Sequence, residues 1–349
     1  MSKIIVTPIY KDSVGRWNKL LAESEESTYQ NSYDYQHQRN EGVREIESFI
    51  FSFENKDIAG VHYTMTKRFL GLFKIANISS GLVFKHTISP EVVKNVLSHF
   101  LYWAKQKKAS YCKVNLWIPS MKSSSIPEYI QPIEGIFTSL GFYPIQEGKH
   151  TYQIDISRTN EEILADMNSG TRRKIRKGLD SDVEIKIFET ADENEINQFW
   201  KLYNYLGKKK GFTTLSEKSF KIEVRSLLNA GQGAIQVLKY NNQVINISFV
   251  TFVGMGMYYH GAVNHDVTKQ KGCPSAGHMA QWQMIQHLKR EGHKKYDMAF
   301  CPGPVPQKNH PLFDMWRFKF GFGGEYIRFM PIYGKVLNPL TGNIIKHLK

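Results

Sequence analysis

The stretch "SPEVVKNVLSHFLYWAKQKKA" (residues 89–109) predicts a helix that decides the fold, because its surroundings occur twice in the chain. Ser89 is a typical N-cap, Pro90 suits a first turn, and apolar residues follow at helical spacing. A second such helix is predicted by "PSAGHMAQWQMIQHLKREGH" (274–293). Each helix is followed by a strand-like segment, "YCKVNLWI" (111–118) or "KYDMAF" (295–300).

Two landmarks place the halves in register. The dipeptides Ser89-Pro90 and Cys273-Pro274 precede the two helices, and "SLGF" (139–142) corresponds to "KFGF" (319–322). The offset is about 180 residues, and fixed-period self-similarity indicates an internal duplication, here of one α/β unit. Ser139 occupies the position of Lys319, so the local fold does not require a lysine there.

The remaining segments keep the same order in both halves. The first half predicts a strand, a helix, a hairpin and a strand-like run at 4–9, 17–24, 47–67 and 72–84. The second half predicts two helices around one strand, then a hairpin and a strand, at 160–178, 183–188, 193–208, 234–254 and 256–264. Asn241 and Asn242 are typical residues for the turn of that hairpin.

Length and composition predict two soluble domains. With 349 residues and 41% hydrophobic residues, the chain exceeds the usual size of a single core. No run of about 18 apolar residues is present, and the first residues are too polar for a signal peptide, so a cytoplasmic protein is expected. Cys112, Cys273 and Cys301 are far apart and lack metal-site spacing, so neither zinc nor disulfides are expected.

The charge of the chain favours a polyanionic partner. The formal net charge is +14, and "SGTRRKIRKG" (169–178) carries five cations without an acid. Arg172 with Arg176, and Arg173 with Lys177, are i,i+4 pairs that form two adjacent basic stripes on a helix. Such stripes suit phosphate contacts with an RNA or a diphosphate.

Several motifs together resemble one family. "TYQIDISRTNEEILADMNSGTRRKIRKG" (151–178), "YYHGAVN" (258–264), "KREGHKKYDMAF" (289–300) and "FKFGFGGE" (318–325) are similar to the second half of FemABX proteins. These are aminoacyl-tRNA-dependent peptidyltransferases that build peptidoglycan interpeptide bridges. The resemblance implies an α/β fold of two tandem GNAT domains, of the compact FemX-like type without a coiled-coil arm.

The resemblance also implies a domain organisation and partners. Residues 1–155 are expected to form the first GNAT-like domain, with 331–349 packing on it, and 156–330 to form the second. The implied substrates are aminoacyl-tRNA and a peptidoglycan precursor, either UDP-MurNAc-pentapeptide or lipid II. No cofactor is implied, and a peripheral contact with the inner membrane face is an open possibility.

The pair Phe318-Lys319 matches the pair that faces the aminoacyl end of the tRNA in this family. A lysine among aromatic rings is partly shielded from water, so its charge acts more strongly on a developing oxyanion or a phosphate. The alternative is a lysine that extends its ammonium to solvent. No GxSxG motif is present, which agrees with direct transfer without a covalent intermediate.

Other candidate residues lie on the strands around this pair. Tyr258 and Tyr259 are neighbours on a strand, so one is expected to face a cleft and the other the core. Asn115 and Asp297 follow the two long helices and are further substrate-binding candidates. The adjacent His260 is either a general base or a structural residue.

Two other functions are compatible with the sequence. An acyl-CoA-dependent N-acyltransferase would need a glycine-rich turn whose N–H groups bind pyrophosphate. The corresponding "KQKGCPSAG" (269–277) has Pro274, which lacks an N–H and weakens this reading. An RNA-binding protein without catalysis is supported by the net charge alone.

Overall fold

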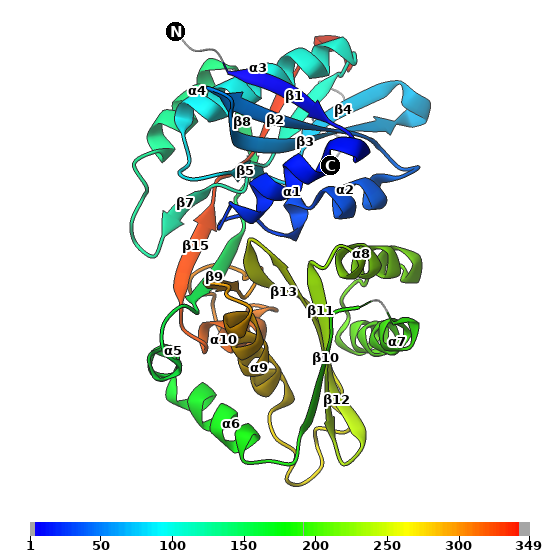
Figure 1. The fold of residues 1–349 in the computed structure, drawn as a ribbon, viewed down its shortest axis with the longest axis vertical. Coiled ribbons are helices and arrows are strands. Elements are labelled where there is room, and N and C mark those ends of the chain that lie inside the picture. The colour runs from blue at the N-terminus through cyan, green and yellow to red at the C-terminus, as the bar shows by residue number, and fades with distance from the viewer. Residues whose placement is uncertain (1–3, 191, 342–349) are drawn as a thin grey trace. The chain divides into compact units, whose positions relative to one another are not determined.

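The computed structural model describes residues 4–190 and 192–341 of the chain. It divides into two compact units, each an α/β sandwich with its own sheet (Figure 1). Unit 1 comprises residues 1–150 and 326–349, and unit 2 comprises residues 151–325. The C-terminal end of the chain therefore returns to the unit formed by its N-terminal part. Of the expected C-terminal segment 331–349, residues 342–349 lie outside the described residues.

The sheet of unit 1 has the strand order β1-β2-β3-β4-β6-β16-β8, with β5 also paired to β3. Its strands are β1 (Ile5–Ile9), β2 (Glu45–Phe53), β3 (Lys56–Arg68), β4 (Phe73–Ile78), β5 (Leu82–Phe84), β6 (Tyr111–Val114), β8 (Tyr143–Gln146) and β16 (Ile332–Val336). A short antiparallel ladder of β7 (Pro119–Lys122) and β15 (Glu325–Phe329) lies outside this sheet. The C-terminal strand β16 thus lies between two strands of the first half.

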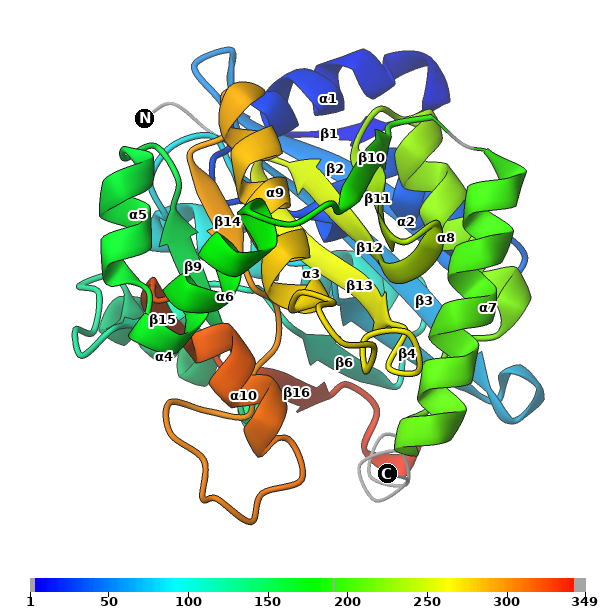
Figure 2. The ribbon, with the colours of Figure 1, turned by 90° about the horizontal axis from the view of Figure 1, so that it is seen from below.

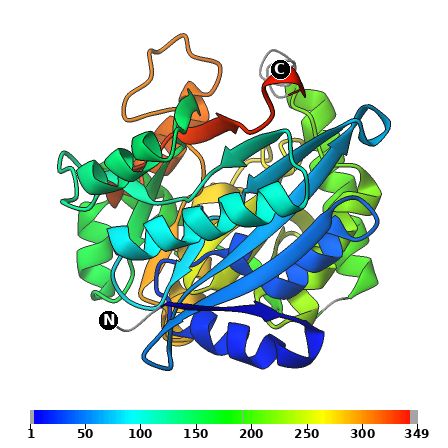
Figure 3. The same ribbon diagram turned by 90° about the horizontal axis from the view of Figure 1, so that it is seen from above.

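Helices cover the sheet of unit 1 unevenly. They are α1 (Val14–Ala22), α2 (Tyr33–Asn40), α3 (Pro90–Gln106) and α4 (Ile130–Ser139). Helices α3 and α4 pack on one face through a core that includes Val96, Phe100, Ile133 and Phe137 (Figure 3). On the other face, α1 and α2 contact β2, β3 and β5. As predicted, Ser89 caps α3 by accepting a hydrogen bond from the Val92 N–H.

The sheet of unit 2 has the order β10-β11-β12-β13-β14-β9. These strands are β9 (His150–Asp155), β10 (Glu184–Phe188), β11 (Gly233–Tyr240), β12 (Gln243–Val253), β13 (Met255–Val263) and β14 (Lys295–Asp297). The helices are α5 (Asn160–Asp166), α6 (Ser169–Leu179), α7 (Glu193–Lys210), α8 (Glu217–Asn229), α9 (Ala276–Arg290) and α10 (Phe313–Phe320). Figure 2 shows α9 on one face of the sheet and α7 with α8 on the other.

In unit 2 one pair of neighbouring parallel strands separates. Strand β13 continues to Val263, but it pairs with β14 only at Gly256 and Met257. In unit 1 the pairing of β4 with β6 covers Ile75 to Ile78. The splayed strands of GNAT-type sheets are therefore present in unit 2. A polar group at the splay lies beside backbone N–H and C=O groups of β13 that do not pair with β14.

Two expected segments differ in detail, and one helix was not expected. The predicted helix over 160–178 is two helices: the first ends at Asp166, and Asn168 caps the second by accepting a hydrogen bond from the Thr171 N–H (2.7 Å). Helix α8 was not predicted. The strand-like run at 72–84 contains two strands, β4 and β5, separated by residues 79–81, where Gly81 has a φ of +78°.

The core of unit 1 gives a test of this packing. Phe100 on α3 is fully buried, whereas Tyr102 on the same helix is 63% exposed. We expect Phe100→Ala to lower the free energy of unfolding by about 3–5 kcal/mol, because it leaves a cavity in the core. Urea unfolding monitored by circular dichroism measures this change. Tyr102→Ala is the control and should change stability by less than about 0.5 kcal/mol; equal effects of the two variants would contradict the described packing.

Candidate active site

The segment around Lys319 ends helix α10 and turns sharply after it. The Asn168 N–H donates to the Gly321 carbonyl (3.0 Å), which fixes the helix end against α6. Gly323 and Gly324 have φ values of +74° and +88°, and a Cβ at either would lie within 2.6 Å of the backbone of Asp166 or Gln153. Glycine is therefore required at both positions.

The neighbouring phenylalanines have separate packing roles. Phe322 is buried, and Phe320 stacks on Trp316 at 4.9 Å between ring centroids. Phe318 packs edge-on against His278 at 5.0 Å, beside the first turn of α9. Together these contacts hold the last turn of α10 in place, with Lys319 on its buried side.

The Lys319 ammonium is the unusual group of unit 2. The residue is only 6% exposed, and Nζ donates a hydrogen bond to the Phe300 carbonyl (2.8 Å). The same atom lies 5.7 Å from the centroid of the Tyr258 ring, within cation–π range. No ion pair joins Lys319 to a carboxylate among residues 4–190 and 192–341. An ammonium has three N–H donors, and the Phe300 carbonyl accepts one of them. Donors therefore remain for an anion or a carbonyl oxygen.

Burial lowers the pKa of Lys319 to about 8, although the charge of Asp297 and then Cys301 act in the opposite direction. The ammonium is thus mostly protonated at neutral pH, close to the point where it titrates. In unit 1 the equivalent Ser139 is exposed and bonds to the Ile136 carbonyl of its own helix. The duplicated fold consequently forms without a cation at this position.

Asp297 is a fully buried carboxylate held by three donors. The Thr151 hydroxyl donates to Oδ1, Gln153 Nε2 donates to Oδ2 (2.9 Å), and the Ala299 N–H donates to Oδ1 (2.6 Å). Burial raises the pKa of Asp297, while these hydrogen bonds oppose the shift. The residue is the last of β14. Its bond with the Ala299 N–H also makes it a cap of the turn that follows the strand.

Thr151 and Gln153 were missed as members of this cluster. They lie two residues apart on β9, so they share a face of the strand, and both are buried. Two polar residues at alternate positions in "TYQIDI" are the sequence signal that could have found them. Gln153 and Phe320 also line a hollow of about 540 Å³ within unit 2.

Tyr258 lies where β13 and β14 separate. It follows Met257, which is paired with Asp297, and burial raises the pKa of Tyr258 to about 12. Its ring is close to Gly261, where a Cβ would overlap the Tyr258 hydroxyl. The Lys319 ammonium, the Tyr258 ring and the Phe300 carbonyl therefore meet at the splay of the sheet.

A β-bulge changes the expected alternation of the two tyrosines. Phe249 pairs with His260 and Val250 with Tyr258, so Tyr259 is the extra residue. The Tyr259 hydroxyl donates to Glu223 of α8, and its ring stacks on His260 at 4.1 Å. Burial lowers the pKa of His260 to about 4, so it is a neutral imidazole at pH 7.

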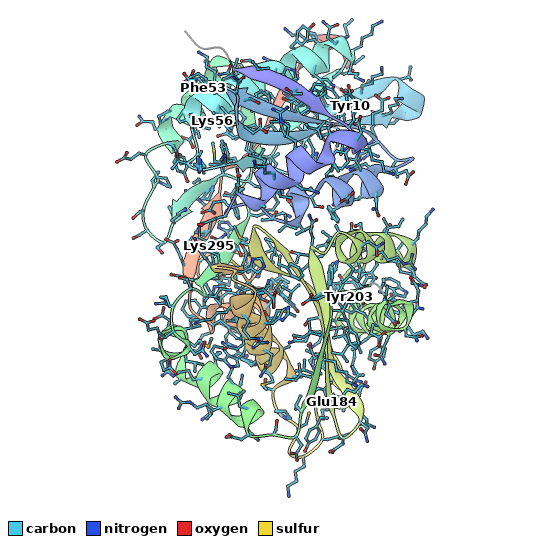
Figure 4. The ribbon with its side chains drawn as sticks, viewed as in Figure 1. Tyr10, Phe53, Lys56, Glu184, Tyr203 and Lys295 are labelled. Carbon is cyan, nitrogen blue, oxygen red and sulfur yellow. The ribbon has the colours of Figure 1, made fainter. Side chains whose placement is uncertain are left out.

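Helices α7 and α8 close this side of the bulge. Tyr203 of α7 lies 5.0 Å from the His260 ring, between ring centroids; it is labelled in Figure 4. Phe220 of α8 lies 5.5 Å from the same ring. Tyr259 and His260 thus pack into the layer formed by α7 and α8, whereas Tyr258 contacts Lys319.

The turn before α9 is poorly suited to pyrophosphate. Pro274 has no N–H, and the Cys273 N–H donates to the Gln270 carbonyl (3.1 Å). The Phe318 ring lies 3.4 Å from the Cβ position of Gly277, in the first turn of the helix. Two of the N–H groups that would hold a CoA pyrophosphate are consequently missing or already used.

The basic residues of α6 line one hollow of about 770 Å³. Arg172, Arg173, Arg176 and Lys177 all contribute, together with Tyr240 and Gly272, so the two stripes face a common space. Arg172 is partly committed, since it donates to the Ala165 and Met167 carbonyls and thereby caps α5. Arg173 and Arg176 are exposed and make no side-chain hydrogen bond or ion pair with another described residue, which leaves them available to a phosphate.

Asn115 lies in unit 1, apart from the cluster described above. It follows β6, and its side chain accepts a hydrogen bond from the Trp117 N–H (3.3 Å). Across residues 4–190 and 192–341 there is no group of three His, Cys, Asp or Glu side chains that could hold a metal ion. The same residues include no helix that is both long and apolar enough to span a bilayer.

Comparisons with known proteins identify the fold. A crystal structure of FemX matches 98% of this chain and 100% of its own, with a TM-score of 0.83 at 14% identity. The chain has a FemABX-like fold. A family model described as an acetyltransferase (GNAT) domain matches residues 165–304. No curated protein matches the sequence.

Two further solved structures have a similar fold. A tandem GNAT protein from the clavulanic acid biosynthesis pathway matches 97% of this chain and 99% of its own, with a TM-score of 0.53 at 11% identity. The C-terminal domain of a putative lysylphosphatidylglycerol synthetase from Agrobacterium fabrum matches 95% and 96%, with a TM-score of 0.55 at 12% identity. The fold and the GNAT match support an acyl-transfer role that involves an acyl donor and an acceptor.

The lowered pKa of Lys319 makes a prediction about stability that is independent of activity. Between pH 8 and 10.5, Lys319 binds more protons in the unfolded chain than in the folded one, so the stability of the fold rises with pH over this range. Below pH 8 the buried charge lowers the stability by its full amount. We expect Lys319→Met to be more stable than the parent at pH 7, by about 2 kcal/mol. The difference should fall towards zero as the pH rises from 8 to the ordinary lysine pKa of 10.5. Urea unfolding at a series of pH values measures it, and a pH-independent difference would contradict the lowered pKa.

Proposed function

We propose that the protein transfers an amino acid from aminoacyl-tRNA to an amine of a peptidoglycan precursor, either UDP-MurNAc-pentapeptide or lipid II. The observation that carries the proposal is the buried Lys319 ammonium at the splay of the unit 2 sheet, which faces Tyr258 and, among the described residues, bonds only to the Phe300 carbonyl. The FemABX-like fold supports an acyl-transfer reaction at such a site.

The chemistry requires positioning and charge rather than a protein nucleophile. The acceptor amine attacks the ester carbonyl, a C–N bond forms, and the C–O bond to the ribose breaks as the amine proton passes to the leaving oxygen. Negative charge develops on the carbonyl oxygen before the ester is broken. An ammonium shielded from water stabilises that charge more strongly than one in bulk solvent. Lys319 supplies this group.

The basic residues of α6 suit the polyanionic part of a substrate. Arg173, Arg176 and Lys177 are exposed side chains around one hollow, and contacts of this kind position phosphates without reading sequence. In the proposed function they bind the tRNA backbone or the diphosphate of the precursor. Asn115, Asp297 and Tyr259 remain proposals as substrate contacts, and Asp297 and Tyr259 also have the structural roles described above.

An acyl-CoA-dependent N-acyltransferase is the second candidate, because the matched family model describes an acetyltransferase domain. Pro274 and the occupied Cys273 N–H favour the tRNA donor over this one. Calorimetric titration with acetyl-CoA distinguishes them: tight binding would favour the CoA donor. In the proposed function the protein acts in the cytoplasm, where both substrates are present.

Substitution of Lys319 tests the proposed chemistry. With aminoacyl-tRNA and precursor supplied, mass spectrometry should show the precursor gaining one amino-acid residue. We expect Lys319→Ala to lower kcat by about 100-fold or more, as for the loss of a preorganised oxyanion donor.

The control for this experiment is Lys308→Ala, which removes an exposed lysine of unit 2 and should leave turnover unchanged. Normal turnover by Lys319→Ala would contradict the proposal that the ammonium stabilises the oxyanion. If the parent protein uses no aminoacyl-tRNA but turns over acetyl-CoA, then acetyl-CoA is the donor and the proposed one is wrong.

The arginines of α6 give a separate test through binding. We expect Arg173→Ala with Arg176→Ala to weaken tRNA binding and to reduce the slope of log affinity against log salt by about 1 to 2. Gel shifts over a salt series measure both quantities. Lys186→Ala, an exposed cation on β10, is the control. If the double substitution leaves the slope unchanged, the RNA does not bind at these two arginines.

A further inference from the structure

Unit 1 carries a large hollow on the face of its sheet opposite α3 and α4, over β4, β6 and β8 and beside the part that α1 and α2 contact. Residues at alternate positions point away from the α3 and α4 core: Ile75 and Asn77 on β4, and Tyr111 and Lys113 on β6. With residues of β3 and β8 they line a trough of about 1090 Å³. We call this hollow the β4–β6 trough.

The β4–β6 trough is lined by cations without counter-charges. Arg44, Arg68 and Lys113 belong to its lining, which has no Asp or Glu among the described residues. None of the three makes an ion pair or a side-chain hydrogen bond with another described residue. Burial lowers the pKa of Arg44, and the charges of Arg39 and Arg68 lower it further. An anionic partner would relieve this repulsion, and phosphate is the anion that arginine recognises best.

An exposed apolar tip adjoins the β4–β6 trough. The turn that joins β3 to β4 contains the 3₁₀ segment η3 (Phe69–Gly71), where Phe69 has a φ of +49°. Such a backbone is unfavourable for a bulky residue, yet it holds a side chain that is 57% exposed, and Leu72 is 76% exposed. Phe69 itself lines the trough, so the apolar tip and the cations form one continuous surface.

A third apolar side chain belongs to the same corner. Val43 is 71% exposed and precedes Arg44. Because Glu45 pairs with Met65, the residues before β2 lie beside the end of β3, where the tip begins. Three exposed apolar side chains next to unpaired cations are the composition of a surface that enters the headgroup region of a membrane.

We propose that this corner of unit 1 docks on an anionic membrane, with Phe69 and Leu72 entering the interface and Arg44 and Arg68 binding a lipid phosphate. The cations alone would also suit RNA or a soluble phosphate ester. The apolar tip distinguishes the cases, because RNA backbone and free phosphate offer nothing apolar to Phe69 and Leu72. The inference does not depend on which acyl donor the protein uses.

Vesicle flotation of the full chain tests this surface. We expect binding to phosphatidylcholine vesicles that contain about 30 mol% phosphatidylglycerol, and little binding to phosphatidylcholine alone. Phe69→Ser with Leu72→Ser keeps the net charge and should weaken binding by about tenfold or more. Arg44→Ala with Arg68→Ala should weaken it by about fivefold per charge and reduce the preference for phosphatidylglycerol.

The controls separate this surface from the general basicity of the chain. Val305→Ser removes an equally exposed apolar side chain of unit 2, and Lys94→Ala removes an exposed cation from α3, on the opposite face of the sheet. Both should bind vesicles like the parent. As a second readout, the fluorescence of Leu72→Trp should shift to the blue when phosphatidylglycerol vesicles are added.

Three outcomes would overturn the proposal. The first is vesicle binding that is absent, or unchanged in the Phe69 and Leu72 double variant, with no shift in Leu72→Trp. The second is an arginine double variant that loses tRNA affinity but keeps vesicle binding, which would make the trough an RNA site. The third is saturable binding of inorganic phosphate that requires Arg44 and Arg68 while vesicle binding does not.

Discussion

The burial of the Lys319 charge is the constraint on which the rest of the site depends. An ammonium removed from water normally needs a carboxylate partner, and here it has one carbonyl and the face of one ring. Asp297 contributes through its charge but is itself fixed by Thr151, Gln153 and the Ala299 N–H. The site therefore keeps a positive charge that is not neutralised by direct pairing, which is the state required to meet negative charge that exists only during a reaction.

The duplication shows which features belong to the fold and which to the site. In both units a long helix precedes a short helix whose last turn carries Lys319 or Ser139. The parallel strands β13 and β14 separate in unit 2, whereas β4 and β6 of unit 1 pair along all of β6. The buried cation and the basic helix α6 occur in unit 2, while unit 1 has at this position an exposed serine that bonds within its own helix. Unit 1 instead carries the β4–β6 trough and the apolar tip beside it. The same architecture thus presents different chemistry in each copy.

Much of the fold could be predicted because its signals are local. The caps, the helical spacing and the Asn-Asn turn are short-range features, and the structure confirms the helix at 89–109 and the hairpin at 234–254. Helix α8 had a comparable signal in Ser216 followed by Phe220 and Val224, but it was not recognised. The bulge at Tyr259 and the three donors to Asp297 depend on pairing between distant strands, which a single sequence does not specify. The burial of Lys319 likewise depends on α10 packing beside the segment after β14.

The pKa of Lys319 is the most direct test of the central claim. It can be measured by NMR titration of protein labelled at the lysine side chains, with the spectrum of Lys319→Arg used to assign the signal. We expect a pKa near 8, well below that of an ordinary lysine. A value close to 10.5 would show an ammonium that water still solvates, and it would contradict the account.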